Sequence, residues 1–157
     1  MVGLGQGTGV FLISYQAINQ AGIAELLDWK VLGASVLAGI LLLGAYPMTQ
    51  VYQHEEDRKH GDLTVSMLLG IRGTFVFCSL FQAVAAAGFT AYFWLIDGPM
   101  KGLLYLVCLA PMLVYFIRWQ RMVARDPGKA DFRMTMGQNF ITSLSLNLFF
   151  LLALFVR

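Results

Sequence analysis

The chain has 157 residues and a net charge of +2; 58% of its residues are hydrophobic and only 13% are charged. A soluble globular domain carries about a quarter charged residues and somewhat under half apolar ones. This chain therefore has too few polar side chains to cover a surface in water, and the lipid bilayer is its natural solvent. The small net charge also argues against a partner made of nucleic acid.

Five apolar stretches are candidates for spanning helices, which need roughly twenty mainly apolar residues. The first, residues 7–22, is short and carries Gln16, Asn19 and Gln20, so it spans only if neighbouring helices satisfy these groups. The others are long and apolar: residues 31–52, 73–96, 99–118 and 138–156. We therefore expect an all-α, polytopic transmembrane helix bundle of four to five spans, with residues 1–157 as a single transmembrane domain.

The distribution of Lys and Arg predicts the orientation of the bundle. With residues 7–22 counted as a span, one side holds eight basic residues: Arg58, Lys59, Arg72, Arg118, Arg121, Arg125, Lys129 and Arg133. The opposite side holds three: Lys30, Lys101 and Arg157. Short cytoplasmic loops are enriched in Lys and Arg, so we expect an integral protein of a bacterial inner membrane with residues 54–62 facing the cytoplasm and basic groups near lipid headgroups.

The least hydrophobic stretch, residues 50–70 (QVYQHEEDRKHGDLTVSMLLG), follows the second apolar stretch directly. If the helix continues, Tyr46, Gln50, Gln53 and Asp57 share one face, because they are spaced four, three and four apart. The i,i+4 pairs Glu56–His60 and Glu55–Lys59 lie beside and opposite this face. Gly61-Asp62 then predicts a helix end, and Thr64 or Ser66 a new helix start.

Residue types alone leave two interpretations of this stretch. It is either a solvated helix end whose charged side chains reach the interface, or a site whose Gln, Glu and Asp oxygens bind Mg²⁺ together with substrate phosphates. His54 and His60 are six residues apart, so a helix does not place them on one face, and we expect interfacial histidines.

The stretch HEEDRKHGDLTVSMLLG resembles the second aspartate-rich segment of the UbiA superfamily of intramembrane prenyltransferases, in which D-x-x-x-D closes a transmembrane helix. Asp57 matches the second Asp, Arg58 and Lys59 the basic positions, Gly61 the Gly and Thr64 the hydroxyl residue. The preceding AGILLLGAYPMTQVYQ and the number and length of the later spans extend the resemblance over nearly the whole chain.

Two features depart from the family pattern. Gln53 stands where the family has the first Asp, and the first aspartate-rich motif (N/D-x-x-x-D-x-x-x-D) is absent. The chain thus resembles the C-terminal half of a UbiA-type fold, and we expect the other half to be a missing N-terminal segment or a partner chain. By itself, this chain is expected to be inactive.

The resemblance implies transfer of an isoprenoid group from a prenyl diphosphate to a lipophilic aromatic or quinone-precursor acceptor, with Mg²⁺ as cofactor. It implies metal ligation by Asp57, with Gln53 and Glu56 as further candidates, and catalytic roles for Asp57 and Lys59. The implied substrate-binding residues are Arg58, Lys59, Arg72 and Thr64. The alternative is a non-catalytic membrane protein, either a transporter segment or an assembly subunit that uses the polar stretch as a cytoplasmic docking site.

Two further patterns predict buried groups within the spans. Cys78 and Cys108 lie in apolar stretches without metal-ligand spacing, so we expect small buried side chains. In the last span, Asn139, Ser143 and Asn147, with Thr142 alongside, form a polar stripe that we expect to face protein or a cavity.

Overall fold

The computed structural model describes residues 2–156, which are helical throughout apart from short connections. The helices are α1 (Val2–Asn19), α2 (Ile23–Leu26), α3 (Trp29–Gln50), α4 (His54–His60), α5 (Val65–Asp97), α6 (Pro99–Arg125) and α7 (Phe132–Ala153). Two short 3₁₀ helices, η1 (Val51–Gln53) and η2 (Pro127–Lys129), join α3 to α4 and α6 to α7. Within the described part there is no strand, so the prediction of an all-α bundle is confirmed.

Four helical segments are long and apolar enough to cross a membrane: Trp29–His60, Val65–Asp97, Pro99–Arg125 and Phe132–Ala153. They contain the four long predicted spans, except for the last few residues of the fourth, and most extend further than hydropathy indicated. α1 is not among them, and it covers Val2–Asn19 rather than the predicted 7–22. It ends there because Gln20 has a positive φ of 53° and breaks the helical path.

Three of the four long helices, α3, α5 and α7, begin where the sequence offers a capping side chain. Asp28 accepts a hydrogen bond from the Lys30 backbone N–H at 2.8 Å, and Asp131 accepts one from the Met134 N–H at 2.8 Å. These bonds satisfy amide groups that have no partner within the first helical turn. α5 and α6 are separated only by Gly98, whose φ of 98° reverses the chain before Pro99.

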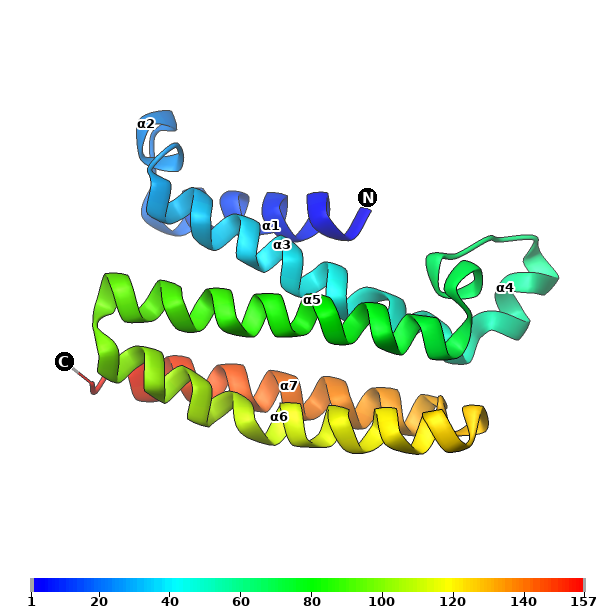
Figure 1. The fold of residues 1–157 in the computed structure, drawn as a ribbon. Helices are drawn as coiled ribbons and strands as arrows, with labels where there is room; N and C mark the ends of the chain where they lie inside the picture. The colour runs from blue at the N-terminus through cyan, green and yellow to red at the C-terminus, as the bar shows by residue number, and fades with distance from the viewer. Residues whose placement is uncertain (1, 157) are drawn as a thin grey trace.

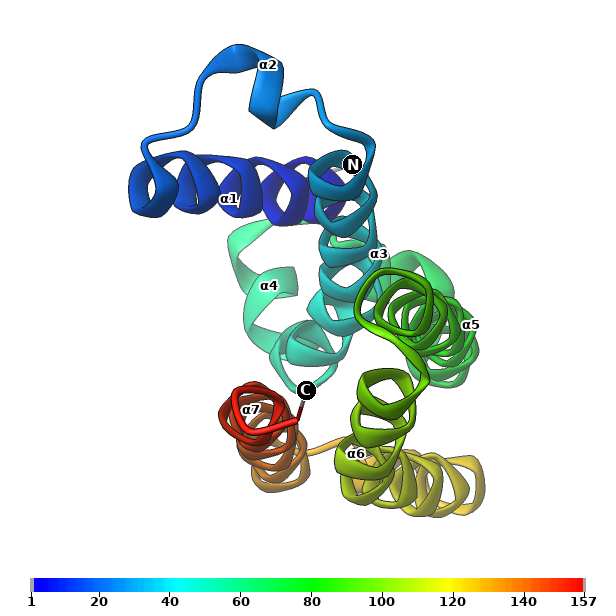
Figure 2. The ribbon, with the colours of Figure 1, turned by 90° about the vertical axis from the view of Figure 1, so that its left-hand side faces the viewer.

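The helices α3, α5, α6 and α7 pack in chain order and form an arc, which is clearest in the end-on view (Figure 2). α1 packs against α3 and crosses it obliquely, on the side toward which the arc opens (Figures 1 and 2). The arc closes only loosely between α3 and α7, and its inner side carries the cavity described below.

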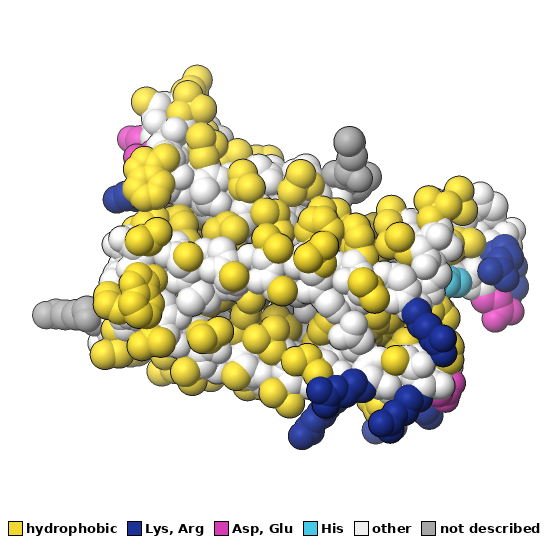
Figure 3. All heavy atoms as spheres, viewed as in Figure 1, with side chains coloured by type: hydrophobic (Ala, Val, Ile, Leu, Met, Phe, Trp, Pro, Cys, Tyr) yellow, Lys and Arg dark blue, Asp and Glu magenta, His cyan; other side chains and the backbone are white. Residues whose placement is uncertain are grey.

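The two ends of the bundle differ in polarity. α4 and the α6–α7 connection lie at one end, whereas α2 and the α5–α6 turn lie at the other (Figure 1). Most of the Lys and Arg side chains visible in the space-filling view gather at the end that carries α4, which we call the polar end (Figure 3). The predicted placement of both basic connections at one end is therefore confirmed as a feature of the fold.

Two hydrophobic clusters hold the arc together. The cluster near the polar end is built from Met48, Val51, Phe75, Cys78, Phe116, Trp119, Val123 and Ala130. The second, toward the other end, is built from Ala86, Tyr105, Cys108, Leu109, Met112 and Phe149. Cys78 and Cys108 are free and buried within these clusters, as predicted for small apolar side chains.

Close approach of α1 to α3 depends on Gly7, and this contact yields a prediction with a matched control. A Cβ atom at Gly7 would lie 2.7 Å from the Gly39 Cα and 2.8 Å from the Ala38 carbonyl oxygen, whereas a Cβ at Gly9 would meet nothing within 4 Å. Alanine favours a helix by about 1 kcal/mol over glycine, but overpacking against backbone costs about 1–3 kcal/mol. Gly7→Ala should therefore lower the thermal stability in detergent micelles, and Gly9→Ala should maintain or raise it. Equal stability of the two variants would contradict this packing.

Candidate functional site

The polar end is formed by the segment that leaves α3, turns through α4 and enters α5. A continuous helix was predicted here, but η1 interrupts it, and α4 bends away from the bundle (Figure 1). A 3₁₀ helix has three residues per turn instead of 3.6. Three such residues rotate the following helix by about 60° relative to a continuous α-helix. The expected common face of Tyr46, Gln50, Gln53 and Asp57 is therefore split into two parts.

The outer side of α4 is a solvated ion-pair network. The Lys59 Nζ lies 3.7 Å from the Glu55 Oε1 and 3.6 Å from the Glu56 Oε2, and the His60 Nε2 lies 3.1 Å from the Glu56 Oε1. Both predicted i,i+4 pairs are thus confirmed. All four side chains are exposed, and exposed pairs of this kind contribute little to stability. Glu56 and Lys59, two of the predicted site residues, are engaged with each other on this outer side.

Asp57 differs from its charged neighbours because it is half-buried. Its Oδ2 atom is buried and has no hydrogen-bond partner among the described residues. Burial of a carboxylate oxygen without a partner is costly unless a cation or donor reaches it. Asp57 is therefore the predicted metal ligand with free coordinating capacity.

The backbone after Asp57 ends α4 as the sequence predicted. Gly61 is left-handed, with a φ of 79°, and the Asp62 N–H donates to the Asp57 carbonyl oxygen at 2.9 Å. This left-handed helix ending favours glycine. It ends α4 about one turn after Asp57, where the chain turns back toward the bundle.

Gln53, the other predicted metal ligand, is exposed, and its amide Nε2 donates to the Tyr52 hydroxyl at 3.0 Å. Tyr46, Gln50 and Thr64 line a cavity of 250 Å³ between the end of α3 and the start of α5. The Gln50 Oε1 is buried and has no partner among residues 2–156, whereas the Thr64 Oγ1 accepts the Met67 N–H at 3.3 Å and caps α5. The structure therefore brings Thr64 together with Gln50, and it leaves Gln53 outside this group.

The basic residues of the polar end are mostly free of acidic partners. Arg58 and Arg72 are exposed, as are the other basic residues of this end: Arg118, Arg121, Arg125, Lys129 and Arg133. Among the described residues, the only cationic side chains in ion pairs are Lys59, His60 and Lys101. The polar end therefore offers unpaired guanidinium groups to an anion or to lipid headgroups.

A hydrogen-bonded chain that the sequence did not indicate connects α4 to α5. The His54 Nε2 lies 2.6 Å from the Ser66 Oγ, and the Thr74 hydroxyl contacts both the Ser66 carbonyl oxygen at 3.2 Å and the Gly70 carbonyl oxygen at 2.9 Å. Gly70 breaks the helical path of α5 with a φ of 66° and a ψ of 168°. Thr74 thus satisfies carbonyl groups near the break. His54 and Ser66 are twelve residues apart across a loop, so no local pattern could have paired them.

The set of possible metal ligands at the polar end is small. The described residues contain no group of three or more His, Cys, Asp or Glu side chains arranged to hold a metal ion. Magnesium is often bound in proteins by one or two carboxylates, with water and substrate phosphates completing its shell. Asp57, with its unpartnered oxygen, fits the role of one such carboxylate, and further ligands must come from elsewhere.

The polar stripe of α7 confirms the prediction in part, because Asn139 and Thr142 line a cavity on the inner side of the arc. Asn139, Ser143 and Asn147 are exposed, and the Asn147 amide donates to the Ser143 carbonyl oxygen at 2.7 Å. The buried polar residues of α7 are instead Thr135, Gln138 and Ser145. Packing against α6 sets how far α7 is rotated about its axis. Neighbouring residues of a helix point about 100° apart, so Gln138 is buried while the next residue, Asn139, is exposed.

Taken together, these features define a bundle of helices, four of which are long and apolar enough to cross a membrane, with one strongly polar end. Comparison of the chain with protein families, with curated proteins and with solved structures returned no match. The chemistry of the polar end therefore rests on the chain's own residues.

Proposed function

We propose that this chain is part of an intramembrane prenyltransferase, and that its polar end binds the diphosphate group of a prenyl diphosphate. The observation that carries the proposal is the buried Oδ2 of Asp57, which has no hydrogen-bond partner among the described residues and lies at the same end of the bundle as several exposed, unpaired guanidinium groups. A carboxylate that lacks a partner and a set of free cations are complementary to a metal–diphosphate pair.

In this proposal Asp57 holds Mg²⁺, and Arg58 and Arg72 contact the diphosphate. Gln53 and Glu56 are secondary ligands that would have to leave their contacts with Tyr52, Lys59 and His60. When bound, Mg²⁺ would supply positive charge where the departing diphosphate gains negative charge. Lys59 forms ion pairs with Glu55 and Glu56 on the outer side of α4. It would contact the diphosphate only after leaving these two carboxylates.

The apolar body of the bundle suits the rest of such a substrate. A prenyl chain is hydrocarbon, and a cavity between spanning helices keeps water away from a cation-like allylic carbon. The acceptor would be a lipophilic aromatic or quinone-precursor molecule that reaches the site from the membrane. The bias of Lys and Arg toward the polar end supports placing that end in the cytoplasm, at a bacterial inner membrane.

Asp57 is one carboxylate with free coordinating capacity, whereas binding of a metal–diphosphate pair from two sides needs ligands that face it. We therefore propose that a second polypeptide segment, in a partner chain or elsewhere in the same protein, contributes the opposing ligands. The alternative function is that of a non-catalytic subunit, in which the exposed ion-pair network of α4 serves as a docking surface.

Binding of farnesyl diphosphate to the chain in lipid nanodiscs, with Mg²⁺ and with a chelator, tests the proposal. We expect saturable binding that requires Mg²⁺ and that inorganic diphosphate competes away. We also expect no prenyl transfer by the chain alone, because half of the clamp is missing. Binding that is indifferent to Mg²⁺ would contradict the proposed site and favour the docking subunit, and measurable transfer would contradict the need for a second segment.

A further inference from the structure

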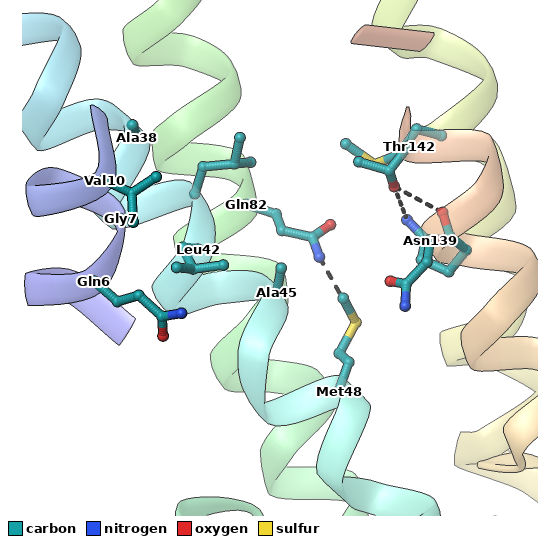
Figure 4. A pocket seen from close by; sticks show the side chains of 13 residues that line it. Gln6, Gly7, Val10, Ala38, Leu42, Ala45, Met48, Gln82, Asn139 and Thr142 are labelled. Carbon is teal, nitrogen blue, oxygen red and sulfur yellow. Dashed lines mark hydrogen bonds between the residues drawn. The ribbon is translucent and has the colours of Figure 1, made fainter. Parts of the chain in front are cut away.

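The inner side of the arc carries a cavity of 410 Å³ whose lining includes none of the proposed metal or diphosphate contacts. It lies between five helices, α1, α3, α5, α6 and α7, and Figure 4 shows how their side chains converge on it. The volume is in the range of small-molecule sites, about 300–1,000 Å³. None of the lining side chains is charged, and most are apolar. A charged ligand would lose its hydration here without a counter-charge.

Gln82 of α5 places an amide at this cavity. Its side chain is 4% exposed and points across the space toward Met48 of α3 (Figure 4). The amide Nε2 contacts the Met48 Sδ at 3.7 Å, which is a weak acceptor. The Gln82 Oε1 is buried and has no hydrogen-bond partner among the described residues.

Gln138 of α7 places a second amide at the same cavity. It is 2% exposed, and its Nε2 contacts the Thr142 Oγ1 at 3.4 Å. Its Oε1 is buried and has no hydrogen-bond partner within the part of the chain that the structure describes. The Thr142 hydroxyl cannot donate to that oxygen, because it donates to the Gln138 backbone carbonyl at 2.8 Å. Both amide oxygens therefore lack a donor.

Two unpartnered acceptors in an apolar setting lower the stability of the bundle, because each loses its hydrogen bonds to water without replacement. Methionine has a similar length and would fill either position without this penalty. The presence of glutamine at both positions is therefore better explained by a group that donates hydrogen bonds to these oxygens than by packing.

We infer that this cavity binds an uncharged, lipid-soluble molecule whose polar end carries hydroxyl groups, which donate to the Gln82 and Gln138 Oε1 atoms. Neighbouring side chains cover both oxygens, so binding requires a rotation of each amide about its terminal torsion, which is broad for glutamine. Met48 is the flexible neighbour of Gln82 and can move aside. The site is independent of the proposed diphosphate chemistry, because it needs neither Mg²⁺ nor a charged group.

Two hydroxyl-bearing probes distinguish the sources of such a ligand: monooleoylglycerol represents a membrane lipid, and pentylresorcinol represents an aromatic diol. Saturable binding of each to the chain in nanodiscs is compared with that of its dimethyl ether, which keeps the shape but has no donor. We expect the diol to bind at least about tenfold more tightly than its ether, the change that follows from loss of one buried hydrogen bond. The probe with the lower dissociation constant identifies the source.

The variants Gln82→Met and Gln138→Met test the two contacts, and Gln120→Met on α6, away from the cavity, is the control. Each test variant should weaken binding of the diol by about tenfold while the ether and the control remain unchanged. Neither should lower the melting temperature, which shows that the bundle still folds. Equal binding of diol and ether, or unchanged affinity in both test variants, would overturn the inference and leave an apolar cleft that acyl chains fill.

Discussion

Replacement of Asp57 by asparagine is expected to weaken the Mg²⁺-dependent binding of farnesyl diphosphate strongly. The substitution preserves the shape of the side chain but removes the negative charge that the unpartnered Oδ2 offers to a cation. Loss of one charge-assisted ligand costs about 2–3 kcal/mol, which is roughly a 100-fold loss of affinity. In an assembled enzyme the same substitution should abolish prenyl transfer.

Asp62→Asn is the matched control, because Asp62 lies in the same connection and is exposed. It should leave the Mg²⁺-dependent affinity within about twofold of the original, since an exposed, screened charge contributes little. Asp57→Asn should also retain or raise the melting temperature, because it removes a buried charge that has no partner. Equal loss of affinity in both variants would indicate a general effect of surface charge and remove Asp57 from the metal site.

Replacement of Trp119 by alanine is expected to cause the largest loss of stability in the bundle. Trp119 is 0% exposed, lies edge-on to Phe75 with 4.7 Å between ring centroids, and donates its Nε1–H to the Lys129 carbonyl oxygen at 2.8 Å. It thereby anchors η2 to α6 beside the polar end. Truncation of a buried aromatic side chain to alanine costs about 3–5 kcal/mol. Thermal unfolding in detergent micelles measures this loss.

Two further substitutions separate the causes of that loss. Trp119→Phe keeps most of the ring but leaves the Lys129 carbonyl without its donor, and we expect it to cost about 1–2 kcal/mol. Trp94→Ala removes an indole that is 45% exposed on α5, and it should cost less than about 1 kcal/mol because much of that ring has no protein contact to lose. If Trp94→Ala lowered the free energy of unfolding as much as Trp119→Ala, the conclusion that Trp119 stabilises the bundle through its burial and its bond to Lys129 would be wrong.

The local features of the polar end could be read from the sequence. The Glu55–Lys59 and Glu56–His60 pairs follow from i,i+4 spacing, the end of α4 follows from Gly61, and the start of α5 follows from Thr64. Each of these depends only on residues within about one or two helical turns. The prediction that Tyr46, Gln50, Gln53 and Asp57 share one helix face is wrong in part, because the 3₁₀ turn at Val51–Gln53 rotates the residues that follow it. Hydropathy gives no clear sign of this turn.

The features that require rotation and packing of whole helices could not be read in this way. The sequence pattern predicts a polar stripe of Asn139, Ser143 and Asn147, with Thr142 alongside. Asn139 and Thr142 do line the cavity, but Ser143 and Asn147 are exposed, and the buried amide of α7 is that of Gln138. A lone glutamine in an apolar span, such as Gln82, was a signal that a polar contact or cavity lies nearby. That Gln138 of α7 lines the same cavity follows only from the arrangement of the helices in an arc.

The sequence by itself determined that the chain forms four long apolar helices that can span a membrane, roughly where they lie along the chain, and that its basic residues collect at one end. These properties follow from hydropathy, capping and spacing, which act over neighbouring residues. Only the tertiary structure decided that Asp57 carries an unpartnered oxygen, that His54 meets Ser66, and that Gln82 and Gln138 line one cavity. Those contacts depend on how far each helix rotates and where it crosses its neighbours, and long-range packing rather than local sequence sets both.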